Sequence, residues 1–199
     1  MSAARRLFAF SVAAVVLVAP AAAHARSAPP KGITAKTAVV RGDKPQDCAN
    51  TDVMPTAQNL ELVRAAVLCL HNQVRLQQGL TRLKDNAKLR KAANGHSSSM
   101  VDEGYFAHTS PRGETFVDRV LGAGYAKRTD GWTLGENLAW GTGDQSTPAG
   151  VMNAWMSSAG HKANIVKPGY REIGVGIRLG VPEDPGVGVT FTAEFGVKG

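Results

Sequence analysis

The chain has 199 residues, a formal net charge of +7 and only two cysteines. Its lysines and arginines form no cluster of the kind that contacts nucleic acid, so the composition argues against a nucleic-acid partner. The modest basic excess favours solubility, and it is also compatible with anionic surfaces such as envelope polymers or phospholipid head groups.

The N-terminus has the three parts of a secretory signal peptide. Arg5 and Arg6 form a basic start, residues 7–19 are an apolar run, and Ala23-His24-Ala25 is a small-x-small cleavage site. We expect residues 1–25 to be removed and the protein to be secreted; the loss of two arginines and no acid lowers the formal charge from +7 to +5. The alternative is an uncleaved anchor, but the run is too short for an ordinary membrane-spanning helix. No stable membrane insertion is expected after cleavage.

Residues 26–55 are rich in Ser, Pro, Lys, Gly, Thr and Asp and have little hydrophobic periodicity, which predicts an extended leader or linker. Cys48 lies in this segment, and Cys69 lies in the first predicted helix. In the oxidising compartment that a secreted protein reaches, an even number of cysteines indicates a disulfide. A bond between Cys48 and Cys69 would stabilise the fold by about 3 kcal/mol through loop closure.

Four helices are predicted from apolar spacing and from capping residues. The expected ranges are 56–79, 86–104, 115–122 and 147–160, and either Thr56 or Asn59 is placed to cap the first helix. The first helix has an apolar stripe at i, i+4, i+7 and i+11 that begins at Val63. Asp85 or Asn86 is placed to cap the second helix, and Thr115 is placed to form a capping box at the third. Thr147, followed by proline, is a good start for the fourth.

The end of the chain changes from helical to strand periodicity. Residues 173–177 alternate apolar residues with glycine, and residues 187–195 alternate apolar residues with Gly, Thr and Glu. A turn over residues 180–186 joins these strands into an antiparallel pair. Helices followed by adjacent strands predict one compact α+β domain over residues 56–199, which is long enough for its own core.

One carboxylate lies between two glycines in the segment Gly135-Glu136-Asn137-Leu138-Ala139-Trp140-Gly141. Glycine permits unusual backbone conformations and close approach, so we expect a fixed loop or strand end that directs Glu136 inward. His108 lies upstream beside serine and proline, and His161 directly follows Gly160, which we expect to end the fourth helix. We therefore predict that Glu136, His108 and His161 converge on one cleft.

Separate motifs follow one another in a fixed order along residues 60–196. They include residues 70–75 (LHNQVR), 106–111 (FAHTSP), 135–139 (GENLA), 160–165 (GHKANI), 172–176 (EIGVG) and 195–196 (FG). In this order they resemble the CAP superfamily, or SCP-like extracellular domain, which includes cysteine-rich secretory proteins, antigen 5 and pathogenesis-related protein 1. The bacterial secreted members are the most similar in motif form and in their few cysteines. The resemblance implies a three-layer α-β-α sandwich with a central, mainly antiparallel sheet and a large cleft.

In many members of this family two histidines and two acids line the cleft. The resemblance places the first histidine at His108, the first acid at Glu136 and the second histidine at His161. Ser158 stands where the second acid of the eukaryotic pattern falls, so the full set of four is not present. Glu194 is a candidate substitute, because strand alternation puts it on the face opposite its apolar neighbours.

Two imidazoles and a carboxylate can bind Zn²⁺ and leave one coordination position open. We expect His108 and His161 to bind a divalent ion, with Glu136 as a ligand or as a hydrogen-bonded partner. The same residues can act as general base and orienting acid, or form a network that only holds loops together. His96 shares a helical stripe with Leu89, which predicts a position in the core or the cleft wall.

Three functions remain open from the sequence. The first is a secreted, non-enzymatic binding module whose cleft holds a metal and a lipid, sterol or cell-envelope ligand. The second is an exported hydrolase of peptide or cell-wall material, but no Gly-x-Ser-x-Gly motif provides a nucleophile. The third is an effector recognised by a partner protein, with the histidines and Glu136 structural. No organic cofactor is expected, because phosphate-cradling and dinucleotide-binding motifs are absent from the sequence.

Overall fold

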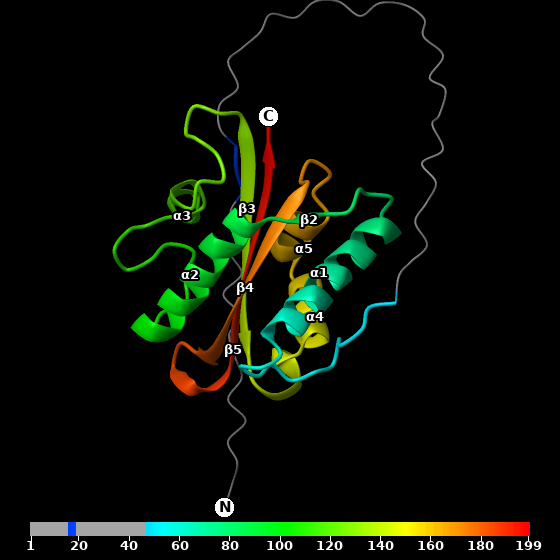
Figure 1. Cartoon of the computed structure of the whole chain (residues 1–199), viewed down its shortest axis with the longest axis vertical. Helices are drawn as coiled ribbons and strands as arrows, with labels where there is room; N and C mark the ends of the chain where they lie inside the picture. Colours follow the sequence, from blue (N-terminus) through cyan, green and yellow to red (C-terminus); the bar gives the residue numbers. More distant parts are fainter. Residues whose placement is uncertain (1–15, 19–46) are drawn as a thin grey trace, which may run out of the picture.

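The structure is a computed structural model that describes residues 16–18 and 47–199. Of the predicted signal peptide only residues 16–18 fall in the described part, and residues 26–46 of the predicted leader lie outside it. Residues 47–199 form three layers, which Figure 1 shows with the sheet close to edge-on. No helix in the described part is long and apolar enough to cross a membrane.

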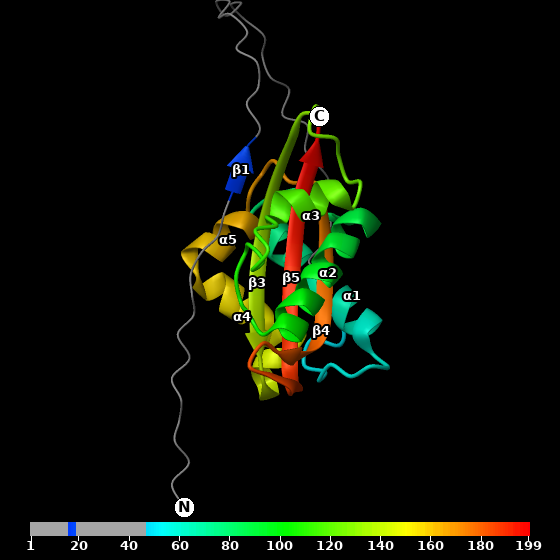
Figure 2. The same ribbon diagram turned by 90° about the vertical axis from the view of Figure 1, so that its left-hand side faces the viewer.

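Within residues 47–199, helices cover both faces of the sheet. Helices α2 and α3 lie on one face, and α1, α4 and α5 lie on the other (Figure 1, Figure 2). The helix bounds are Leu60–Gln77 (α1), Ala87–Glu103 (α2), Phe116–Gly122 (α3), Pro148–Ser157 (α4) and Ala159–Ile165 (α5), with a short 3-10 helix at Gly143–Ser146 (η1). The predicted three-layer α-β-α arrangement is confirmed.

The sheet is mainly antiparallel, with strand order β1-β3-β5-β4-β2. The strands are β1 (Val16–Val18), β2 (Lys84–Asp85), β3 (Trp132–Gly141), β4 (Glu172–Val181) and β5 (Asp184–Lys198). The central strand β5 pairs antiparallel with both β3 and β4, and β2 is parallel to β4. The two predicted strands lie inside β4 and β5. The observed strands extend further toward each other than alternation indicated, because the hairpin between them is tight.

Side chains of β5 alternate between the two faces of the sheet. Phe191 and Phe195 join the larger apolar core, which also contains Trp155 of α4. The next position along the strand, Thr192, faces α2 and accepts a hydrogen bond from the Ser97 hydroxyl at 2.9 Å. The face of β5 toward α2 therefore carries the polar side chains of this strand.

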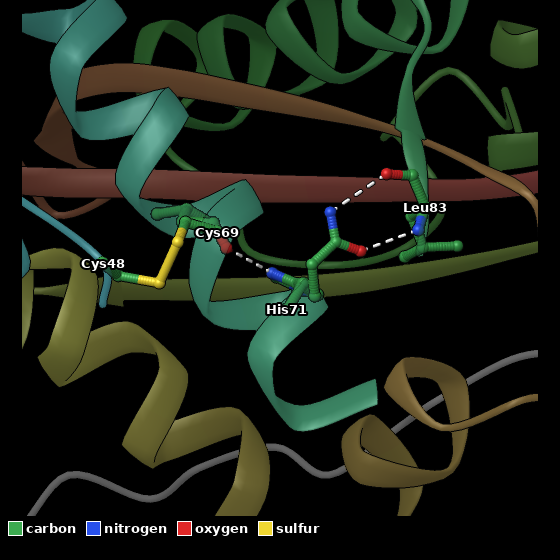
Figure 3. Close-up of a disulfide and its surroundings, with 6 residues drawn as sticks. Cys48, Cys69, His71 and Leu83 are labelled. Atoms are coloured by element: carbon green, nitrogen blue, oxygen red, sulfur yellow. Dashed lines mark hydrogen bonds between the residues drawn. A yellow bond between two sulfur atoms is a disulfide. The ribbon is translucent and has the colours of Figure 1, made fainter. Parts of the chain in front are cut away.

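A disulfide joins Cys48 to Cys69 and ties the segment before α1 to that helix (Figure 3). The backbone N–H of Ala149 at the start of α4 donates to the Thr51 carbonyl at 2.8 Å. Residues 47–55, part of the expected linker, are thus fixed against the domain. Periodicity could not indicate this, because the attachment depends on a covalent bond and a backbone contact rather than an apolar stripe.

Capping residues define the helix starts much as predicted. The Asn86 side chain accepts hydrogen bonds at the start of α2, and Thr115 and Asp118 form a complete capping box at α3. Thr147 caps α4 by accepting from a backbone N–H of its first turn. The first helix begins at Leu60 with Asn59 at its N-cap, the second of the two predicted starts, although the Asn59 side chain makes no cap hydrogen bond.

Candidate functional site

Glu136 lies within β3 and not in a loop or at a strand end, which corrects the sequence-based expectation. The glycines near it allow close approach rather than a turn. A Cβ at Gly135 would lie 2.2 Å from the Tyr170 hydroxyl, and one at Gly141 would lie 2.7 Å from the Gln145 carbonyl oxygen. The close approach expected of these glycines is therefore confirmed, whereas the loop or strand end expected at Glu136 is not.

The Glu136 carboxylate is fully buried and has two firm partners. His108 Nδ1 donates to its Oε1 at 2.6 Å, and Arg119 Nη2 donates to its Oε2 at 2.8 Å. The same guanidinium nitrogen donates to the His108 carbonyl at 2.9 Å, so Arg119 holds both members of the pair. Burial opposes ionisation, but the hydrogen bond from His108 and the positive charge of Arg119 lower the pKa of Glu136.

Arg119 is a residue of this network that was not predicted from the sequence. The arginine is 8% exposed and belongs to α3, a seven-residue helix whose inner face is otherwise apolar. A signal for it was present, because Arg119 directly precedes Val120 and lies one turn after Phe116 on the buried stripe. A cation in such a stripe requires a buried anion, and Glu136 provides it.

Glu194 lies directly across from Glu136 in the pairing of β5 with β3, on the face that alternation predicted. It is fully buried beside the Glu136 carboxylate, and its carboxyl oxygens have no other hydrogen-bond partner among the described residues. Burial, followed by the negative charge of Glu136, raises the pKa of Glu194 well above its usual range. Two adjacent buried carboxyls therefore divide their roles, with Glu136 ionised and Glu194 neutral.

This difference in protonation between Glu136 and Glu194 predicts that Glu194→Gln changes stability in a pH-dependent way. Because the pKa of Glu194 is raised in the folded protein, the unfolded chain releases this proton first and wild-type stability falls as pH rises above 4.5, the ordinary value. Glutamine does not ionise, so the variant should match wild type near that pH and have the higher melting temperature at about pH 8. Differential scanning calorimetry at both pH values measures this.

Glu172→Gln in β4 is the matched control. Burial opposes ionisation of Glu172, but hydrogen bonds from Tyr125 and Asn86 outweigh it and lower its pKa. The ionised Glu172 carboxylate stabilises the folded protein above its ordinary pKa. Glu172→Gln removes this contribution and should lower the melting temperature at about pH 8. Equal shifts for Glu194→Gln at both pH values would show that its carboxyl is not held neutral.

His96 lies on α2 and is fully buried, in the core position that its helical stripe predicted. Its Nε2 lies 2.9 Å from the Ala107 carbonyl oxygen and 3.9 Å from Oε2 of Glu136. Burial is the main reason that the pKa of His96 falls to about 4, although the charge of Glu136 opposes this shift. A neutral His96 therefore supports the loop that carries His108 and does not complete a triad.

His161 occupies the first turn of α5, which corrects the expectation that it follows the end of a helix. The chain breaks one step earlier, at Ser158, whose extended backbone separates α4 from α5, and Gly160 lies inside α5. The ring of His161 makes no hydrogen bond with a described residue. Burial and then the nearby charge of His108 lower the pKa of His161. The two histidines are thus neighbours, but His161 does not contact Glu136.

A cavity of about 810 Å³ runs along α4, from η1 to the start of α5. Its apolar lining includes Ala139 of β3 and Val151, Ala154 and Trp155 of α4. Of the sequence-predicted site residues, His161 and Ser158 line this cavity, whereas His108, Glu136, His96 and Glu194 are not among its lining residues. The predicted cleft is thus divided into a buried polar network and an adjacent apolar cavity.

The polar network does not form a three-ligand metal site. Among residues 16–18 and 47–199, no group of three or more His, Cys, Asp or Glu side chains is placed to hold a metal ion. Both oxygens of Glu136 accept hydrogen bonds, and the one from His108 Nδ1 is placed to orient that imidazole. Zinc binding by His108 and His161 stays a prediction from the sequence.

Two proteins of Bacillus subtilis (strain 168) are similar in sequence. The chain is 40% identical over 110 residues to the uncharacterized protein YkwD and 33% identical over 111 residues to the uncharacterized membrane protein YlbC. These matches cover 55% and 56% of this chain but only 40% and 30% of the relatives. The chain therefore spans less than half the length of the curated relatives that it matches.

An extracellular protein containing an SCP domain from Bacillus anthracis str. Ames has a similar solved structure. The TM-score is 0.55 with 24% identity, over 72% of this chain and 44% of that chain, which shows a shared fold. Residues 68–188, more than half of the chain, match the family model of the cysteine-rich secretory proteins. The chain therefore belongs to the cysteine-rich secretory protein (CAP) family.

Proposed function

We propose that this protein is a secreted, non-enzymatic binding module whose ligand occupies the cavity along α4. One observation carries the proposal: the cavity of about 810 Å³ has the size of a small-molecule site and an apolar lining. Half-buried Ala154 and buried Trp155 of α4 line the cavity together with Ala139 of β3. A lipid, sterol or envelope component with an apolar body suits such a lining.

Export is supported by two separate features of the chain. The N-terminal sequence has the parts of a signal peptide, and the Cys48–Cys69 disulfide is of the kind that persists in oxidising compartments. The solved relative from Bacillus anthracis is itself described as extracellular. We therefore place the binding function outside the cytoplasm.

Hydrolysis is less well supported than binding. The Ser158 hydroxyl, which lines the cavity, is buried without a hydrogen-bond partner, so no base among the described residues activates it. The negative charge of Glu136 is balanced by Arg119, and its carboxylate accepts a hydrogen bond from His108. These contacts suit a structural role. An effector that a partner protein recognises would need no small-molecule ligand. An assay of small-molecule binding therefore separates that alternative from the proposed function.

The proposal predicts that filling the cavity abolishes binding of an apolar probe. N-phenyl-1-naphthylamine, whose fluorescence rises in apolar surroundings, should bind the full-length protein with a dissociation constant on the order of micromolar. Ala154→Trp places an indole in the cavity and should weaken binding by about tenfold or more. Ala163→Trp on the exposed side of α5 is the control and should bind as wild type does.

Thermal unfolding of both variants checks that they remain folded. Absence of probe binding to wild type would contradict the proposal and favour the effector alternative. Equal affinity of the two tryptophan variants would show that the probe binds at another place on the protein.

A further inference from the structure

The α4 cavity differs in charge from the rest of the protein. The chain has 23 lysines and arginines against 16 acidic residues, yet the residues that line the cavity include Asp52 and Asp144 and no lysine or arginine. Both aspartates are exposed. An apolar cavity with only carboxylates for formal charge favours a cationic ligand over an anionic one.

The two carboxylates lie at the same end of the cavity. Asp144 belongs to η1, which leads into α4. Asp52 follows Thr51, whose carbonyl oxygen accepts the Ala149 N–H of α4 at 2.8 Å. The disulfide at Cys48 holds the same segment against α1. The acidic end of the cavity is therefore built from two segments that are both fixed on the start of α4.

The start of α4 offers no free donors to an anionic head group. Pro148 has no N–H, and the N–H of Ala149 is taken by the Thr51 carbonyl. The next N–H, of Gly150, donates to the Thr147 hydroxyl at 3.0 Å, and the N–H after it donates to the Thr147 carbonyl. Helix N-termini commonly bind anions through such N–H groups. At the start of α4 these N–H groups already have acceptors and do not bind an anion, and the adjacent aspartates repel one.

The opposite end of the cavity offers a polar group to a ligand. His161 is 7% exposed and lines the cavity, and its ring has no hydrogen-bond partner among the described residues. Its ring nitrogens are not fully buried, so a polar group of a ligand in the cavity can reach them. The ten residues of α4 separate the two ends by roughly 15 Å, which is close to the length of an extended twelve-carbon chain.

We propose that the cavity selects a cationic amphiphile. The ammonium group lies beside Asp52 and Asp144, and the hydrocarbon chain lies along Ala139, Ala154 and Trp155 toward His161. This inference rests on the proposed binding function, because it specifies the ligand of the same cavity. Acidic amphiphiles such as fatty acids bind more weakly because the aspartates repel them, and uncharged ones bind with intermediate affinity.

Three ligands with one chain length test the head-group preference. Dodecylamine, dodecanol and dodecanoate are titrated into the full-length protein below their aggregation concentrations, with the fluorescence of the cavity tryptophans as readout. We expect dodecylamine to bind at least about tenfold more tightly than dodecanoate, and we expect salt to reduce this difference. The double variant Asp52→Asn/Asp144→Asn should remove most of the difference in affinity between dodecylamine and dodecanoate.

The control is Asp47→Asn/Glu183→Gln, which changes the net charge equally at exposed positions outside the cavity. It should keep the preference of wild type. If dodecanoate binds as tightly as dodecylamine, or the control removes the preference as fully as the cavity variant, the head-group inference is wrong while the binding function stands. If none of the ligands binds and the neutral probe also fails, the binding function itself is wrong.

Discussion

Replacing Arg119 with methionine is expected to lower the free energy of unfolding by about 3–5 kcal/mol. The guanidinium is the permanent cation that contacts the fully buried Glu136 carboxylate, and methionine would leave that charge with His108 as its remaining partner. The change also removes hydrogen bonds to the carbonyl oxygens of His108 and Glu114. Urea denaturation followed by circular dichroism measures the loss.

Two further variants make this result specific. Arg128→Met removes another arginine–carboxylate pair, with Asp118, but both side chains are exposed, so the expected loss is under about 1 kcal/mol. Adding Glu136→Gln to Arg119→Met removes the buried negative charge and should recover part of the stability. A loss for Arg119→Met no larger than that for Arg128→Met would show that Glu136 is not ionised in the folded protein.

Replacing Gly176 with alanine is expected to cost about 3 kcal/mol, which is a large effect for one methyl group. A Cβ at this position of β4 would lie 2.2 Å from the carbonyl carbon of Ala93, in the backbone of α2. Helix α2 would have to move away from the sheet, and His96, one turn further along, would move with it. Thermal unfolding measures the loss, and a changed Tyr105 environment near His96 would report the shift.

Gly95→Ala is the matched control for the same substitution. Gly95 lies inside α2, and no heavy atom lies within 4 Å of the place that a methyl group would take, so alanine should stabilise the helix by about 0.5–1 kcal/mol. Changes in stability of opposite sign for Gly176→Ala and Gly95→Ala would support close packing of α2 on β4. A neutral effect of Gly176→Ala would show that α2 is not held against the sheet at this point.

Local chemistry explains which elements could be predicted from the sequence. Thr115 with Asp118, and Thr147 before Pro148, are short-range signals that act through neighbouring backbone groups, and the helices start at them. Alternation in residues 187–195 likewise placed Glu194 on the polar face of β5. These features depend on a few adjacent residues, which is why they can be derived without a structure.

The features that could not be predicted depend on contacts between distant segments. Gly135 in β3 resembles a break when only its neighbours in sequence are considered, because its need for space comes from Tyr170, which lies beyond α5 in the chain. The partner of Glu136 was missed because Arg119 reaches it from α3. The cavity combines β3, η1, α4 and the segment at Asp52, and only the disulfide signalled that this last segment is fixed.

The most direct test of the binding function is a crystal structure of the full-length protein with dodecylamine. We predict that the hydrocarbon chain lies along α4 against Ala154 and Trp155, with the ammonium group within hydrogen-bond distance of Asp52 or Asp144. A ligand found beside His108 and Glu136, or a cavity along α4 without ligand at saturating concentration, would contradict this assignment.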